Sequence, residues 1–71
     1  MGFKKNDPCL AKVSDDEPIF VFRAQDQIAD RYVDAWADDV ADFLGEEHPK
    51  VVEARACAAA MRKWPTRKLP D

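Results

Sequence analysis

The sequence predicts a mainly α-helical fold, in which a short helical segment and two longer helices form a small bundle. Residues 26–44 repeat apolar side chains every four positions, which indicates one long amphipathic helix. Residues 49–64 form an alanine-rich segment that starts at a proline, as a second long helix often does. The length of 71 residues predicts a single domain, 1–71, whose core is small enough to favour completion of the bundle by homo-oligomerisation.

The N-terminal third gives conflicting local signals. Residues 1–13 show no clear period, and we predict an irregular segment with room for one helical turn. Residues 14–17 fit a capping box, which favours a short helix over residues 17–24. The run Ile-Phe-Val-Phe at residues 19–22 instead has the composition of a strand. The alternative fold is therefore α+β, with an N-terminal hairpin that pairs this run with residues 10–13.

The second predicted helix runs from Asp26, a good N-cap residue, to Leu44, because Gly45 supplies the positive φ at which many helices end. Two apolar rows with a spacing of four follow this helix, and we expect the row with the larger side chains to face the core. The larger row is Ile28, Tyr32, Trp36, Val40 and Leu44, and the smaller row is Ala29, Val33, Ala37 and Ala41.

The third predicted helix begins at Pro49 and continues to Lys63, and a basic, extended tail follows over residues 65–71. Its expected apolar side consists of Val52, Ala56 or Cys57, Ala59, Ala60 and Trp64.

The sharpest pattern in the sequence is a row of aspartates along the second predicted helix. The row lies about 200° around the helix from the larger apolar row, so we expect it to face outward. Like charges at this spacing cost roughly 0.2–0.5 kcal/mol per pair, and replacing Asp30, Asp34 and Asp38 by Asn should leave the fold intact or more stable. An ordinary solvated face and a binding surface for a basic partner both fit the pattern. The candidate partner-binding residues are Asp26, Asp30, Asp34, Asp38, Asp39 and Asp42.

The net charge of −3 is unevenly distributed along the chain. Residues 1–47 carry five bases and twelve acids, whereas residues 48–71 carry six bases and two acids. Such asymmetry either holds the two parts together or presents oppositely charged faces to different partners. The cationic face has its own candidate site, an alternative anion-binding set of Arg23, Arg55, Arg62 and Trp64, in which stacking on the indole adds to charge.

Other chemistries lack the residues that they need. His48 is the only histidine, Ser14 the only serine, and two glycines provide no phosphate-binding loop, so we predict a protein that is not an enzyme and uses no cofactor. A magnesium site at Asp34 and Asp38 needs acids from another helix, where Glu53 stands alone, so no metal site is predicted. No apolar run reaches the roughly 20 residues of a membrane span and no secretory signal pattern is present. We expect a cytoplasmic protein with no membrane partner.

Four runs are spread over most of the length of the chain: residues 8–12 (PCLAK), 16–26 (DEPIFVFRAQD), 50–55 (KVVEAR) and 60–64 (AMRKW). Together they resemble a group of small uncharacterised proteins encoded by phages and prophages of proteobacteria. The resemblance implies an accessory phage role in the cytoplasm of a bacterial host cell. It assigns no functional residue, because the group has no established activity.

These observations lead to one main hypothesis and one alternative. The main hypothesis is a small non-enzymatic accessory protein that binds a basic host macromolecule through the acidic helix. Four helical residues rise about 6 Å, close to the phosphate spacing of a nucleic acid, so its narrower form is an inhibitor of host defence, anti-CRISPR-like or a nucleic-acid mimic. The alternative is an oligomeric binder that sequesters a nucleotide or signalling molecule through Arg23, Arg55 and Trp64.

Overall fold

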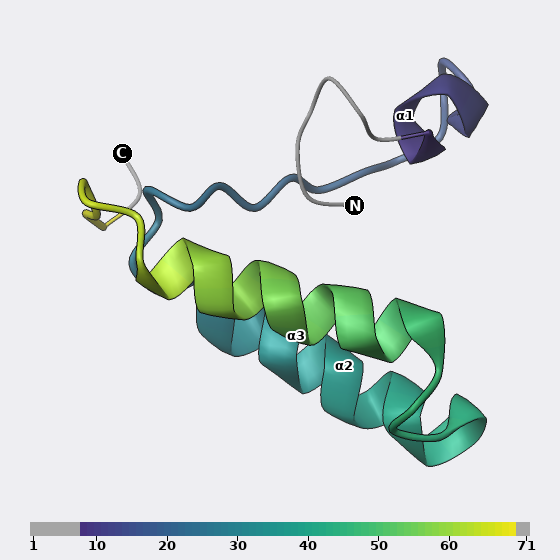
Figure 1. Ribbon diagram of the computed structural model, residues 1–71. Coiled ribbons are helices and arrows are strands. Elements are labelled where there is room, and N and C mark those ends of the chain that lie inside the picture. The colour runs from purple at the N-terminus through teal and green to yellow at the C-terminus, as the bar shows by residue number, and fades with distance from the viewer. Residues whose placement is uncertain (1–7, 70–71) are drawn as a thin grey trace.

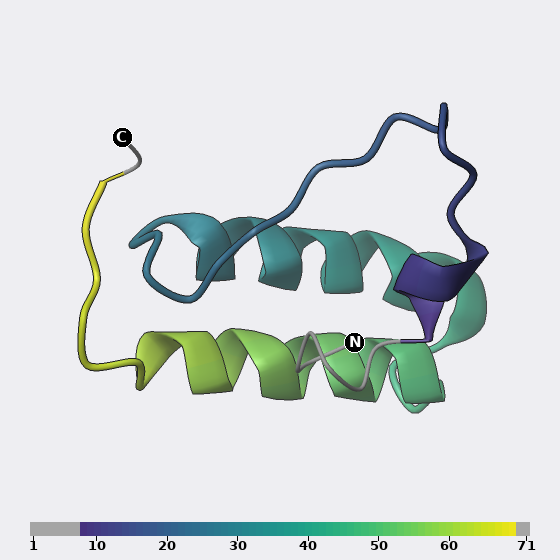
Figure 2. The same cartoon turned by 90° about the horizontal axis from the view of Figure 1, so that it is seen from above.

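The computed structural model describes residues 8–69 of the chain, which form an antiparallel helical hairpin with an irregular arm at each end (Figure 1). The three helices are α1 (Cys9–Lys12), α2 (Ala29–Leu44) and α3 (Pro49–Arg62). Helices α2 and α3 lie side by side in both views, and the extended segment after α1 passes across α2 (Figure 2). The prediction of a mainly helical fold with two longer helices packed together is confirmed.

Helix α2 begins at Ala29 with Ile28 as its N-cap residue, two residues later than the predicted N-cap residue Asp26. Asp26 Oδ1 accepts a hydrogen bond from the backbone N–H of Ile28 at 3.0 Å, and the Asp26 carbonyl accepts one from Ala29 at 3.1 Å, so Asp26 caps a turn that precedes the helix. The predicted end of the helix is confirmed. Gly45 has a φ of 95° and donates its N–H to the carbonyl of Ala41 at 2.8 Å.

Helix α3 begins at Pro49, as predicted, and ends at Arg62, close to the expected Lys63. His48, the residue before Pro49, is half-buried and caps this helix. Its Nδ1 accepts a hydrogen bond from the backbone N–H of Lys50 at 3.1 Å.

The core is a seam of small side chains between α2 and α3. At its centre Ala37, Val51 and Ala54 have no exposed surface. The smaller row of α2 therefore faces α3. Val40 of the larger row also packs against this core, but the expectation that the larger row faces the core is wrong for Tyr32, Trp36 and Leu44. Tyr32 and Trp36 remain 54% and 44% exposed, because a seam of alanines brings the two helices too close together for large rings to fit between them. The buried apolar residues are Ala29, Ala37, Val51, Ala54, Ala58 and Met61.

The apolar side predicted for α3 is displaced by one residue. Val51 is buried where Val52 was expected, and Val52 is 55% exposed. Ala54, Ala58 and Met61 follow Val51 at helical spacing and complete the side that faces α2.

Residues 17–23 form neither the predicted short helix nor the alternative hairpin. The Glu17 N–H bonds the carbonyl of Ser14 at 3.0 Å, which closes a turn in place of a capping box. Pro18 and the β-branched residues after it then favour an extended chain. The hairpin is absent because its intended partner strand lies largely in the helical turn α1.

The two ends of the chain complete the description. Within the N-terminal segment predicted to be irregular, residues 9–12 form α1, and residues 1–7 lie outside the described part. Cys9 in α1 and Cys57 in α3 are not joined by a disulfide. Of the predicted extended tail, residues 65–69 contain no helix, and residues 70–71 lie outside the described part. None of the helices within residues 8–69 is long and apolar enough to cross a membrane.

Candidate functional site

The aspartate row of α2 meets a row of arginines from α3 along one edge of the hairpin. Arg62 donates from Nε to the Asp30 carboxylate at 2.8 Å and also bonds Asp34. Seven residues earlier, Arg55 donates from Nη2 to Asp38 at 2.9 Å and lies 3.8 Å from Asp34. Because the helices are antiparallel, two arginines seven residues apart on α3 lie opposite three aspartates that span eight residues of α2. The charge asymmetry of the sequence therefore holds its two halves together.

Arg55 has a second carboxylate partner in the turn between the helices. Its Nη2 donates to Glu46 Oε2 at 3.0 Å, and its Nε bonds the other oxygen of the same carboxylate. These hydrogen bonds, first from Glu46 and then from Asp38, raise the pKa of Arg55. Arg55 thus joins the turn to both helices as a permanent cation.

A third arginine, Arg67, fixes the C-terminal segment to the start of α2. Its guanidinium donates to the carbonyl oxygens of Ala24 and Asp26, at 3.1 and 3.0 Å, and to Asp30 Oδ1 at 2.8 Å. The adjacent Lys68 bonds the backbone on both sides of Asp26, in a short parallel bridge. The tail that the sequence presented as extended and basic is therefore tied to the hairpin.

Asp30 lies at the centre of this network and is only 8% exposed. The hydrogen bond from Arg67 lowers the pKa of Asp30 below its ordinary value of 3.8, and Arg62 adds to this effect, while burial opposes it. The carboxylate of Asp30 therefore stays ionised in the folded chain, and both of its oxygens accept from a guanidinium.

This lowered pKa predicts the direction of the pH dependence of stability. The stabilisation from Asp30 should be fully present above pH 3.8 and should be lost as the pH falls through the lower pKa of the folded state. The urea midpoint, followed by circular dichroism from about pH 5 to about pH 2, should fall with acidification. Asp30→Asn should flatten this dependence, and Asp39→Asn should not. An unchanged pH profile in Asp30→Asn contradicts the assignment.

The structure separates the six candidate aspartates into two groups, and the expectation that the whole row faces outward is wrong. Asp30 is buried and Asp34 partly buried, because α2 turns its small row towards α3 and brings the neighbouring aspartates with it. Asp38 is exposed but paired, and Asp26 bonds its own backbone turn. Within residues 8–69, Asp39 and Asp42 are exposed and have no side-chain partner.

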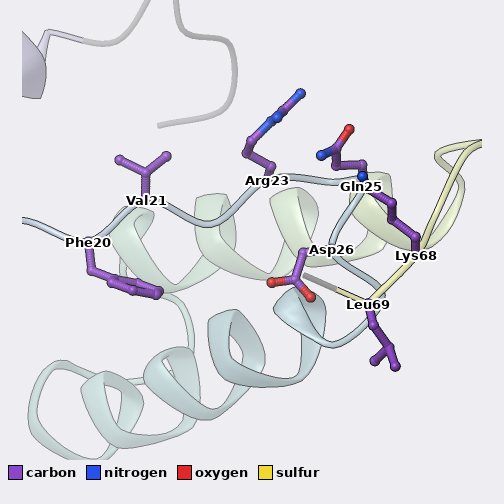
Figure 3. Close-up of a pocket in the computed structure, with 7 residues that line it drawn as sticks. All are labelled: Phe20, Val21, Arg23, Gln25, Asp26, Lys68 and Leu69. Carbon is purple, nitrogen blue, oxygen red and sulfur yellow. The ribbon is translucent and has the colours of Figure 1, made fainter. Parts of the chain in front are cut away.

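The alternative anion-binding residues are also divided. Arg55 and Arg62 are engaged by carboxylates, whereas Arg23 and Trp64 are exposed. Arg23 lines an open pocket of about 240 Å³ together with Lys68, but Asp26 lines the same pocket and opposes an anion there (Figure 3). The structure therefore brings together no cationic site from the set predicted by the sequence.

Sequence reasoning missed Arg67 as a structural residue. The number of aromatic residues did indicate an exposed interface patch, but not that three of them form one apolar stripe on α2, because the larger row was expected to face the core. The stripe consists of Tyr32, Trp36 and Phe43, which are 54%, 44% and 87% exposed. Steps of four and seven residues keep these three side chains within about 40° of one another. Asp39 borders the stripe, and Asp42 lies beyond Asp39 around the helix. We call these five residues the outer α2 surface.

Among the described residues no cluster of three or more histidine, cysteine or acidic side chains has the geometry to hold a metal ion. Comparison of the chain with known protein families, curated proteins and solved structures found no match.

Proposed function

We propose that this protein is a small non-enzymatic accessory protein, of the phage type, that binds a basic protein of the host through the outer α2 surface. The observation that carries the proposal is the exposure of Tyr32, Trp36 and Phe43 as one stripe bordered by unpaired carboxylates. The partner is then a protein with an apolar patch and lysine or arginine side chains at its rim.

The composition of the stripe supports a protein partner. Tyrosine and tryptophan are enriched among the residues that contribute most to binding free energy, and an exposed apolar patch of this kind marks interaction surfaces. The monomer gains little from Phe43, which is 87% exposed. A partner that covers the stripe gains the burial that the hairpin itself does not use.

The position of Asp42 supports the acidic character of the surface. It lies in the last turn of α2, where the helix macrodipole disfavours an anion, and that turn contains no basic residue to offset the cost. Asp39 stands one turn earlier, also without a cation. Two carboxylates that do not stabilise the chain are well placed to attract a basic partner and to raise the association rate.

The pairing within the hairpin favours this proposal over the two other hypotheses. A nucleic-acid mimic needs a continuous row of carboxylates, and three members of the row already bind arginines. A nucleotide binder needs Arg55, which Glu46 and Asp38 already engage.

The test begins by finding the partner through the surface itself. A photo-crosslinking amino acid at Ala35, which is exposed beside Asp39 and Asp42, should capture the partner in host cells. The same crosslinking amino acid in place of Ala59, which is exposed on α3, is the matched control. The affinity of the purified partner is then measured for the wild type, for Trp36→Ser and for Asp39→Asn with Asp42→Asn.

We expect Trp36→Ser to weaken binding by at least about tenfold, because truncation of a central aromatic contact costs 2 kcal/mol or more. The double Asn variant should slow association and reduce its dependence on salt. Glu53→Gln with Asp16→Asn removes the same charge elsewhere and should have little effect. Equal affinity in all variants, or capture at Ala59 but not at Ala35, contradicts the proposal.

A further inference from the structure

The extended segment of residues 17–23 has the character of a β-strand without a neighbour. All seven residues are exposed, including Ile19 at 55%, Phe20 at 81% and Val21 at 66%. Side chains alternate across it as in a strand, with Phe20 directed towards the hairpin and Val21 away from it (Figure 3). Phe22 stacks on Tyr32 of α2, with ring centroids 6.1 Å apart, and Phe20 packs edge-on against Phe22.

Its backbone carries unused hydrogen-bonding groups between two turns. One turn ends with the Glu17 N–H bonded to Ser14, and the other begins with the Arg23 carbonyl, which accepts from the Asp26 N–H at 2.9 Å. Between these turns, the backbone N–H and C=O groups of residues 19–22 bond no other described residue. An exposed row of such groups with β-branched and aromatic side chains is a template for pairing with another strand.

The charges at the ends of the segment identify what it pairs with. Glu17 and Arg23 are each three residues from Phe20, and neither has a side-chain partner within residues 8–69. If two copies of the segment run antiparallel about Phe20, Glu17 of each copy lies opposite Arg23 of the other. Opposite charges that face each other across a strand pair stabilise it. The segment is therefore complementary to itself.

We propose that two copies of this protein associate by pairing residues 17–23 as antiparallel strands about a two-fold axis at Phe20. The two chains meet here through the backbone edge of the segment, which differs from the outer α2 surface although Phe22 contacts Tyr32 of that surface. The inference does not depend on the function proposed above. The strand-like composition of residues 17–23 then serves a contact between two chains.

The register of this pairing is compatible with Pro18, which has no N–H, and with Phe20 at the two-fold axis. With Phe20 opposite its own copy in a non-hydrogen-bonded pair, Pro18 lies opposite Phe22 in a pair of the same kind, where its missing N–H costs nothing. Ile19 and Val21 then face each other in hydrogen-bonded pairs. The N–H of Arg23 reaches the carbonyl of Glu17 in the other chain. The Glu17 N–H and the Arg23 carbonyl, which already bond within the two turns, lie at the ends of the paired strands.

The first test measures association of the full chain by sedimentation equilibrium from low micromolar to submillimolar concentration. We expect a monomer–dimer equilibrium that Glu17→Arg or Arg23→Glu weakens about tenfold, because each change creates two like-charged pairs across the interface. The double variant should restore the wild-type affinity. Glu53→Arg changes the net charge by the same amount as Glu17→Arg at another exposed site and should have no effect.

A second test separates strand pairing from any other contact. The chain is short enough for chemical synthesis, which allows N-methylation of one chosen peptide bond. N-methylation at Val21 removes a donor directed at the partner and should abolish the dimer. N-methylation at Phe20 removes a donor that points away from the partner and should leave the dimer intact. In a mixture of differently labelled copies, NMR should show a contact between the Hα atoms of Pro18 and Phe22 of different chains.

A chain that stays monomeric throughout overturns the proposal. A dimer whose affinity is unchanged by both charge reversals also overturns it. The same holds for a dimer that survives N-methylation at Val21 and disappears in Trp36→Ser, because the two copies then associate through α2. A monomer that still binds a basic partner through Trp36 contradicts this inference alone, and a strand-paired dimer without such a partner contradicts only the proposed function.

Discussion

The variant Arg67→Ala is expected to lose about 2–4 kcal/mol of unfolding free energy, a large part of the roughly 4–10 kcal/mol typical of a domain this size. Arg67 is 19% exposed at its side chain and donates to two carbonyl oxygens and to Asp30. Its removal leaves these acceptors without their donor and frees the C-terminal segment. Urea denaturation followed by circular dichroism measures the loss.

Two further variants distinguish the geometry of Arg67 from its charge. Lys63→Ala removes an exposed cation from the same end of the hairpin and should change stability by less than about 0.5 kcal/mol. Arg67→Lys keeps the charge but cannot bond three acceptors in the same fork, so it should recover only part of the loss. If Arg67→Ala is as stable as Lys63→Ala, the tail does not hold the hairpin.

Replacing Asp30, Asp34 and Asp38 together by Asn is expected to leave the chain largely unfolded at room temperature. The sequence alone predicted the opposite, because repulsion within the aspartate row seemed to outweigh any gain. In the structure the three carboxylates face Arg55, Arg62 and Arg67, and an amide cannot replace both the charge and the two accepting oxygens. The helical signal as a function of temperature tests this result.

The matched comparison is Asp39→Asn with Asp42→Asn, which changes the same type of residue on the same helix. These carboxylates have no cation, and Asp42 opposes the helix macrodipole, so this variant should be unchanged or more stable by about 0.3–1 kcal/mol. A triple variant as stable as this double variant shows that the arginine pairs contribute nothing measurable.

Local signals in the sequence predicted the helical hairpin well. Pro49 and Gly45 act within one or two residues of their position, so the end of α2 and the start of α3 follow from them directly. The start of α2 was predicted too early, because Asp26 can bond either a helix or a turn and the choice depends on the tail that Arg67 holds against it.

The face of α2 that packs on α3 was not predictable from hydrophobicity alone. Two apolar rows compete on that helix, and the aromatic row has the larger transfer free energy. The alanine row is buried instead, because it allows close packing and lets Arg62 reach Asp30. The contact between Arg67 and Asp30 joins residues far apart in the chain, and no periodic pattern in the sequence reports such a pair.

The seam of alanines around Val51 also determines how the hairpin responds to heat. Unfolding a chain that buries little apolar surface changes its heat capacity little, so its stability curve is shallow and its thermal transition broad. The arginine–carboxylate pairs beside the seam act in the same direction, because the cost of removing charges from water falls as the temperature rises. The free energy of unfolding of this hairpin should therefore vary only slowly across the physiological range of temperature.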